Sequence, residues 1–241
     1  MPIMRLIICI LLLLAASIAV PAAAEPADST MAPASDALRP AVDEDILDVR
    51  LFRFLNGSIK NGLFDFLMPI MTDFRRSRVF VILVWATLVI LGGQKGRWAG
   101  LMIILLVAAS DQLSSSLIKP LVERMRPCEV LGSVHLWYGP EGWIVTPPEA
   151  IGGFKTSFSF PSSHAANITS SMLFLALAYR RWAALPLLVM ILVSFSRIYI
   201  GVHWPSDVAA GMALGALLAV AAYLVFRRIS FEKKRPDDSR T

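Results

Sequence analysis

The chain has 241 residues, of which 56% are hydrophobic and only 17% are charged, and its mean hydropathy is +0.63. A soluble globular domain carries about 25% charged residues, so this composition excludes a disordered chain and argues strongly against an ordinary soluble enzyme. The net charge of +5 comes from basic residues at the ends of apolar blocks rather than on one surface, which argues against a nucleic-acid partner. The sequence therefore predicts an all-α, polytopic membrane helix bundle.

The first apolar block, residues 6–20, follows Arg5 and is followed by the small residues of 21–24. This order is typical of a secretory signal peptide. Residues 1–24 are therefore predicted to be a signal peptide, with a retained first transmembrane helix as the alternative. Residues 25–45 are rich in Ala, Pro, Ser and Asp and predict an acidic periplasmic tether.

Residues 46–77 mix Leu and Phe with charged side chains such as Arg50, Arg53 and Asp65, and they contain two Asn-Gly pairs. Charges at this density favour amphipathic helices that lie in the membrane interface over helices that span it. We therefore predict interfacial helices in this segment.

Residues 78–226 are predicted to form the membrane core. Five apolar segments are long enough to cross a bilayer: 78–93, 98–118, 163–179, 182–200 and 205–226. The connections 94–97 and 180–181 and the tail 227–241 are basic. Because basic segments beside a span stay in the cytoplasm, the tail is predicted to be cytoplasmic and the loops 119–161 and 201–204 to face the periplasm. The basic residues of 75–78 fall on the outer side in this arrangement and count mildly against it.

Ionisable residues are scarce in this chain, and three clusters of them fall on the predicted periplasmic side. In the first cluster, Lys119 and Arg126 are seven residues apart, which is two turns of a helix, so both cations can point the same way. The second cluster, Ser162-Ser163-His164, opens a helix and offers hydroxyls beside free backbone N–H groups, which suits an anion.

The third cluster contains Arg197, His203 and Asp207. Pro205 fits the first turn of a helix, which puts Asp207 near the third helical position. From there its carboxylate can fix the tautomer and orientation of the His203 imidazole.

Together these clusters predict phosphoryl transfer. Three cations and backbone donors match the oxygens and the charge of a phosphate, and two histidines allow one to attack while the other protonates the leaving oxygen. The clusters carry no Asp, Glu or His set with metal-ligand spacing, so we predict a mechanism without a metal or another cofactor.

The clusters resemble the signature of the type 2 phosphatidic acid phosphatase superfamily, whose motifs are written K-x6-R-P, P-S-G-H and S-R-x5-H-x3-D. The first and third motifs match completely, and in the second Ser163 stands where the family usually has Gly. The resemblance implies that His203 is a nucleophile that forms a phosphohistidine, that Asp207 holds it, and that His164 is the general acid. It also implies that the phosphoryl group is cradled by Lys119, Arg126, Ser162, Ser163 and Arg197.

The resemblance implies a six-helix bundle if the first apolar block is retained, and five core spans if it is cleaved. It also implies a bacterial lipid phosphatase on the outer face of the inner membrane, with undecaprenyl pyrophosphate as the favoured substrate. Phosphatidylglycerol phosphate, phosphatidic acid and lipid A 1-phosphate are alternatives, because the motifs recognise the phosphate and not the lipid. A lipid-to-lipid phosphotransferase and a non-catalytic lipid-binding or transport bundle are alternatives from other classes. The oligomeric state stays open.

Three further features have open interpretations. Asp111 is an intramembrane acid that either links to Lys119 or helps helices to pack through the neighbouring serines. The loop 128–160 is rich in aromatic residues, which favours a belt at the membrane interface, with a lid over the site as the alternative. Cys128 is predicted to be a surface thiol.

Overall fold

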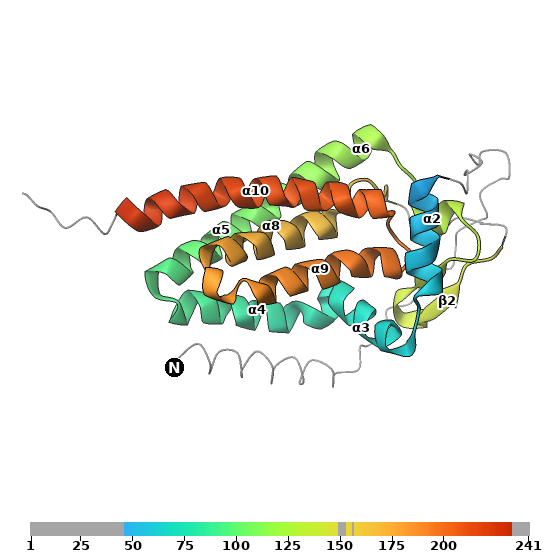
Figure 1. Ribbon diagram of the computed structural model, residues 1–241, viewed down its shortest axis with the longest axis horizontal. Helices are drawn as coiled ribbons and strands as arrows, with labels where there is room; N and C mark the ends of the chain where they lie inside the picture. The colour runs from blue at the N-terminus through green and yellow to red at the C-terminus, as the bar shows by residue number, and fades with distance from the viewer. Residues whose placement is uncertain (1–45, 149–152, 156, 233–241) are drawn as a thin grey trace, which may run out of the picture.

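The computed structural model describes residues 46–148, 153–155 and 157–232. Within them, five long helices run along the molecule (Figure 1): α4 (Phe74–Leu91), α5 (Gly93–Asp111), α8 (Ser163–Ala178), α9 (Ala184–Tyr199) and α10 (Pro205–Glu232). Each overlaps one of the segments predicted to span the membrane, and α10 continues six residues past the predicted boundary at residue 226. The predicted helical bundle is therefore confirmed.

Two stretches of the described chain, Gly93–Val130 and Pro205–Ile229, are long and apolar enough to cross a membrane by length and composition. The number of spans stays a prediction, because α8 and α9 have 16 residues each. The predicted signal peptide or first helix (1–24) and the tether (25–45) lie outside the described residues, as does residue 233 onward of the predicted tail.

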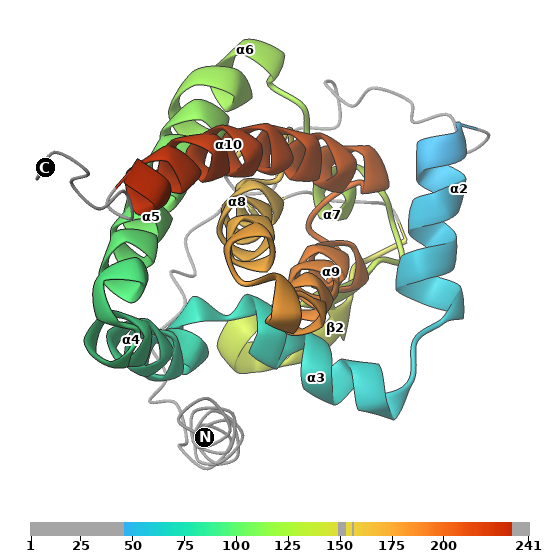
Figure 2. The same ribbon diagram turned by 60° about the vertical axis from the view of Figure 1, so that its left-hand side comes forward.

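Helix α8 lies at the centre of the bundle, with α5, α9 and α10 around it (Figure 2). Its contact with α10 is close because glycines replace side chains at the crossing. A Cβ atom on Gly211 would lie 2.4 Å from the carbonyl oxygen of Ser162, and one on Gly215 would lie 2.5 Å from that of Ala166. Small residues let two helix backbones approach in this way. The starts of α8 and α10 are consequently joined directly, and the Ser162 N–H donates to the Asp207 carbonyl at 3.0 Å.

Helix α5 continues through a π-helix, η3 (Gln112–Ile118), into the short helix α6 (Lys119–Val122). The chain then leaves the helix at Glu123, whose φ is +51°, and α7 (Pro127–Val130) follows. Arg126 is extended (φ −79°, ψ 154°), because a proline disfavours helix in the residue before it. Lys119 and Arg126 therefore do not share a helix, and the two-turn spacing argument is wrong.

The end of the bundle that holds α6 and the starts of α8 and α10 is covered by two small layers (Figure 1). One layer comprises α2 (Leu47–Arg53), the π-helix η2 (Phe54–Ser58) and α3 (Gly62–Thr72). The other is an antiparallel hairpin of β1 (His135–Trp137) and β2 (Trp143–Val145), connected through η4 (Gly139–Glu141), with Leu136 opposite Ile144. The all-α prediction is therefore corrected by one two-stranded sheet. A further 3-10 turn, η5 (Arg180–Trp182), lies at the opposite end.

The segment 46–72 has both buried and exposed apolar side chains. Val49 and Phe52 of α2 lie in the core, whereas Leu47 and Leu63 are more than 60% exposed. The exposed side chains suit helices that lie against a membrane surface, and the interfacial location stays a prediction.

The hairpin is fixed to α3 and α9 by a polar and aromatic cluster. The His135 ring stacks on Trp143 with centroids 4.1 Å apart, and His135 Nε2 lies 2.9 Å from Asp65 Oδ1. The Tyr199 hydroxyl donates to the same carboxylate at 2.7 Å. Aromatic residues of the 128–160 loop thus pack against the protein. Cys128 is fully buried here, so the prediction of a surface thiol is wrong.

Candidate active site

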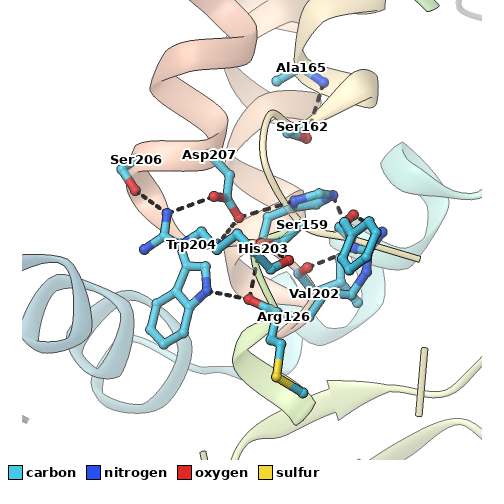
Figure 3. Close-up of polar contacts among 12 residues, drawn as sticks. Arg126, Ser159, Ser162, Ala165, Val202, His203, Trp204, Ser206 and Asp207 are labelled. Carbon is cyan, nitrogen blue, oxygen red and sulfur yellow. Dashed lines mark hydrogen bonds and ion pairs between the residues drawn. The ribbon is translucent and has the colours of Figure 1, made fainter. Parts of the chain in front are cut away.

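The three sequence clusters meet at the covered end of the bundle (Figure 3). Arg126 precedes α7, Ser162 caps α8, Arg197 lies in the last turn of α9, and Asp207 lies in the first turn of α10. His203 occupies the tight turn between α9 and α10. The expected grouping of cations, hydroxyls and imidazole is thus present at one end of the fold.

The turn that carries His203 depends on Gly201. Its φ of +85° is costly for other residues, and a Cβ there would lie 2.8 Å from the carbonyl oxygen of His135 in the hairpin. The N–H of His203 donates to the carbonyl of Arg197 at 3.2 Å, which ties the turn to the end of α9. These contacts bury the imidazole, which is 2% exposed.

Both ring nitrogens of His203 have defined neighbours (Figure 3). Nδ1 lies 3.4 Å from Asp207 Oδ2, and Nε2 lies 3.2 Å from Arg126 Nη1. A guanidinium only donates hydrogen bonds, so Nε2 is the acceptor in this contact and the ring proton is on Nδ1, facing the carboxylate. The lone pair of Nε2 is therefore directed toward the cationic side of the site.

The electrostatic surroundings keep this imidazole neutral. Burial lowers the pKa of His203 well below its ordinary value, and the positive charges of Arg197, Arg126 and Lys119 act in the same direction. A neutral imidazole has an unprotonated nitrogen, here Nε2, with the lone pair that a nucleophile needs.

Asp207 is the third residue of α10, as predicted, and its side chain is fully buried. Oδ2 accepts from the backbone N–H of Trp204 at 2.9 Å, in the way that an acid at the third helical position reaches back to the cap. Oδ1 accepts from Arg124 Nη1 at 2.7 Å. Both oxygens are thus fixed, and the one that faces His203 cannot rotate away without breaking the other bonds.

Arg126 is clamped by backbone and side-chain oxygens. Its Nε donates to the carbonyl of Ser157 at 2.7 Å, and its Nη1 donates to the carbonyl of Val202 at 2.9 Å. Ser159 closes the loop behind it by donating from its backbone N–H to the Arg124 carbonyl at 2.7 Å. Arg126 is 6% exposed, and these hydrogen bonds fix the direction of its guanidinium.

Within the described chain, the Arg197 side chain has one N–H donor, at Nη1, that is hydrogen-bonded and another, at Nε, that is not. Its Nη1 donates to the Thr72 hydroxyl of α3, whereas its buried Nε has no hydrogen-bond partner within the part of the chain that the structure describes. A buried donor without a partner is costly, and an anion bound in the site would satisfy it. Lys119 lies within electrostatic range of both Arg126 and Arg197.

The second motif is partly engaged in holding the fold. The Ser162 hydroxyl accepts from Ala165 N at 3.4 Å as the cap of α8. The Ser163 hydroxyl lies 2.9 Å from that of Ser115 in η3, so this side chain, at the position of the family's glycine, is directed toward the neighbouring helix. Ser115 in turn donates to Asp111 at 3.2 Å, which links this acid to the site. His164, the second residue of α8, is exposed.

Four residues near the site were missed by sequence reasoning: Asp48, Thr72, Arg124 and Lys155. Desolvation lowers the pKa of Lys155, and the charge of Arg197 acts in the same direction, so this loop residue adds a cation to the group. Its backbone N–H donates to Glu129 Oε1 at 2.6 Å. Of these four residues, only Arg124 could have been found from the sequence, because it lies inside the first motif.

Among the described residues, no group of three or more His, Cys, Asp or Glu side chains is arranged to hold a metal ion.

The PAP2 superfamily sequence model matches residues 100–231, which is more than half of the chain. A lipid A 4'-phosphatase of Bacteroides thetaiotaomicron is 27% identical over 192 residues, covering 76% of this chain and 79% of that protein. An undecaprenyl-diphosphatase of Sulfolobus acidocaldarius is 38% identical over 77 residues, covering 32% of this chain and 37% of that protein.

Among solved structures, that of Aquifex aeolicus LpxE is similar with a TM-score of 0.53 and 25% identity, covering 75% of this chain and 98% of that one. The family match includes every motif position from Lys119 to Asp207. The chain therefore belongs to the PAP2 superfamily, as a membrane-embedded helical phosphatase that hydrolyses phosphoester bonds.

Proposed function

We propose that this protein removes phosphate from a membrane lipid through a phosphohistidine formed on His203. The observation that carries the proposal is the pairing of the two ring nitrogens, with Nδ1 facing Asp207 and Nε2 facing Arg126. This pairing leaves a neutral, buried imidazole whose unprotonated Nε2 faces the place where Lys119, Arg126 and Arg197 attract an anion.

In the first step, Nε2 of His203 attacks the phosphorus and the bond from phosphorus to the lipid oxygen breaks. His164 donates a proton to that oxygen, so the lipid leaves as a neutral alcohol or as a protonated phosphate. Asp207 stabilises the positive charge that develops on the imidazole. Lys119, Arg126 and Arg197 stabilise the negative charge on the transferring phosphoryl oxygens, with Ser162 and Ser163 beside them at the start of α8.

In the second step, water attacks the phosphohistidine while His164 accepts a proton from it. The bond between phosphorus and Nε2 breaks, inorganic phosphate leaves, and the neutral imidazole is restored. The net reaction converts the lipid phosphate and water into the dephosphorylated lipid and inorganic phosphate, with no redox change and no further reactant.

For the substrate, we propose undecaprenyl pyrophosphate, on the outer face of the bacterial inner membrane. The number of cations supports a diphosphate, because Lys155 extends the group formed by Lys119, Arg126 and Arg197. The similarity to an undecaprenyl-diphosphatase gives further support. A lipid A phosphate is the second candidate, since the lipid A 4'-phosphatase is similar over 192 residues.

The test is phosphate release by the purified protein in detergent from undecaprenyl pyrophosphate, lipid A, phosphatidylglycerol phosphate and phosphatidic acid, each with excess EDTA. We expect turnover of at least one lipid, highest with undecaprenyl pyrophosphate, and loss of more than about 10³-fold in His203→Ala. Acid-labile, base-stable phosphate should be trapped on the wild type and not on the variant. Full activity of His203→Ala would overturn the nucleophile, and loss of wild-type activity in EDTA would contradict a mechanism without metal.

A further inference from the structure

A chain of charged side chains leads from helix α2 to the imidazole. Asp48 Oδ2 accepts from Arg124 Nη2 at 2.6 Å, and Arg124 Nη1 donates to Asp207 Oδ1 at 2.7 Å. Asp207 Oδ2 then faces His203 Nδ1. One guanidinium therefore bridges two carboxylates, of which the second is the acid proposed to orient the nucleophile.

Asp48 also fixes the start of the helix that carries Asp207. Its Oδ1 accepts from the backbone N–H of Ser206 at 2.9 Å, and its Oδ2 accepts from the Ser206 hydroxyl at 2.5 Å. A carboxylate at the positive end of a helix dipole is favourable. Its neighbours secure its place, because Phe52, one turn later in α2, is fully buried and packs on the Trp204 ring with centroids 5.5 Å apart. The Asp48 side chain is 15% exposed, so solvent screens these interactions only in part.

The charges of this chain have a consequence for the reaction. Asp48 and Asp207 carry two negative charges and Arg124 carries one positive charge, so a net negative charge lies behind His203. The imidazole becomes positive when Nε2 bonds to phosphorus, while the cations in front of it repel that charge. Without Asp48, the charge of Arg124 would cancel that of Asp207, and Arg124 would lose one of the two ion pairs that orient it. The Asp207 carboxylate would then stabilise the positive imidazole less, and its orientation toward Nδ1 would be less well fixed.

We propose that Asp48 is a positioning residue for phosphoryl transfer, acting through Arg124 on Asp207 and so on His203. Asp48 lies outside the range matched by the superfamily, residues 100–231, so this contribution comes from the amphipathic segment that covers the end of the bundle. The inference rests on the proposed role of His203.

The first test is Asp48→Asn, which keeps the shape of the side chain and an acceptor for Ser206 but removes the charge. The probes are farnesyl pyrophosphate, which is a short-chain polyprenyl pyrophosphate, and dioctanoyl phosphatidic acid, which is a short-chain lipid phosphomonoester. We expect kcat to fall about tenfold or more with KM changed by less than about twofold, because the lost interaction acts on the transition state. Asp48→Glu should recover part of this loss, since it restores the charge.

Glu123→Gln is the matched control. It removes one negative charge next to Arg124 in the sequence, but Glu123 is exposed, and we expect its kcat to stay within about twofold of the wild type. If Asp48→Asn lowers the thermal midpoint but leaves kcat unchanged, the residue is only structural and the inference is wrong.

A double-mutant cycle tests the route through Arg124. In an Arg124→Gln background, Asp48→Asn should cost less than about twofold in kcat, because the partner through which it acts is gone. Equal losses in both backgrounds would overturn the proposed route. His203→Ala, assayed in the same series, separates the two proposals. If that variant is active, the proposed function fails; if it is inactive while Asp48→Asn is normal, only the role of Asp48 fails.

Discussion

At the scale of single residues, the site is defined by what lies on each side of one imidazole. Asp207 accepts on the Nδ1 side and Arg126 donates on the Nε2 side. A carboxylate and a guanidinium in these places select one tautomer, and burial excludes the water that would otherwise stabilise the protonated ring. The tautomer of His203 thus follows from these two side chains, and its neutral charge state follows chiefly from burial.

This arrangement predicts that His203 stays neutral in mildly acidic solution. An ordinary histidine side chain has a pKa of about 6.5. The pKa of His203 is lowered well below this value, so its imidazole stays unprotonated at pH values where an exposed histidine is protonated. NMR of protein with ¹⁵N-labelled histidine would show no titration of the His203 signal between pH 8 and 5.5, with the shifts of an Nδ1–H tautomer. His203→Ala identifies that signal by removing it. A midpoint near 6.5 for this signal would contradict the prediction.

At the scale of elements, the close crossing of α8 and α10 holds two motifs together. Small residues face each other there, with Gly211 and Gly215 on α10 against Ala166 and the start of α8. The bond from Ser162 N to the Asp207 carbonyl forms only because the backbones approach this closely. The distance between these helices therefore sets the distance between the second and third motifs.

Gly215→Leu should force the two helices apart. A Cβ at this position would lie 2.5 Å from the Ala166 carbonyl and 2.9 Å from Ser170 N, both backbone atoms that cannot move independently. Overpacking of this kind costs about 1–3 kcal/mol, which is a fall of roughly 5 °C in Tm for a chain of this size. The control is Ala213→Leu, which adds the same side chain on the exposed face of α10. Equal Tm values for the two variants in detergent would show that the crossing does not require glycine.

The sequence predicts the helices of this fold well because their apolar runs are long and continuous. It also identifies His203 and Asp207, since Pro205 fixes where α10 begins. The sequence does not predict the turn after α6, because no local pattern marks Glu123 as left-handed. It also does not predict the two short strands of the hairpin, because contacts with α3 and α9 hold them in place. Asp48 was missed for a similar reason, since it meets Arg124 across 76 residues of chain and looks like one more charge of an amphipathic helix.

At the scale of the whole molecule, the two ends of the bundle differ in chemistry. One end carries the three motifs under α2, α3 and the hairpin (Figure 1). The other end carries the turn between α4 and α5 and the turn η5, with Lys95, Arg180 and Arg181. Lys95 donates to the Ala178 carbonyl at the end of α8 at 2.8 Å and lies over the Tyr179 ring. A cation at a helix C-terminus is favourable, and basic residues at this end favour a cytoplasmic location.

This asymmetry predicts that the candidate active site faces the periplasm. Single cysteines at Glu141 in the hairpin turn and at Gln94 at the start of α5, both exposed positions, would be placed in a background with Cys9→Ala and Cys128→Ala. A membrane-impermeant maleimide added to spheroplasts should label Glu141→Cys and spare Gln94→Cys, and lysis should expose the second site. The pair is its own control, because the two variants differ only in the end of the bundle that carries the thiol. Labelling of Gln94→Cys alone would reverse the topology and would put the phosphate site in reach of lipids of the inner leaflet.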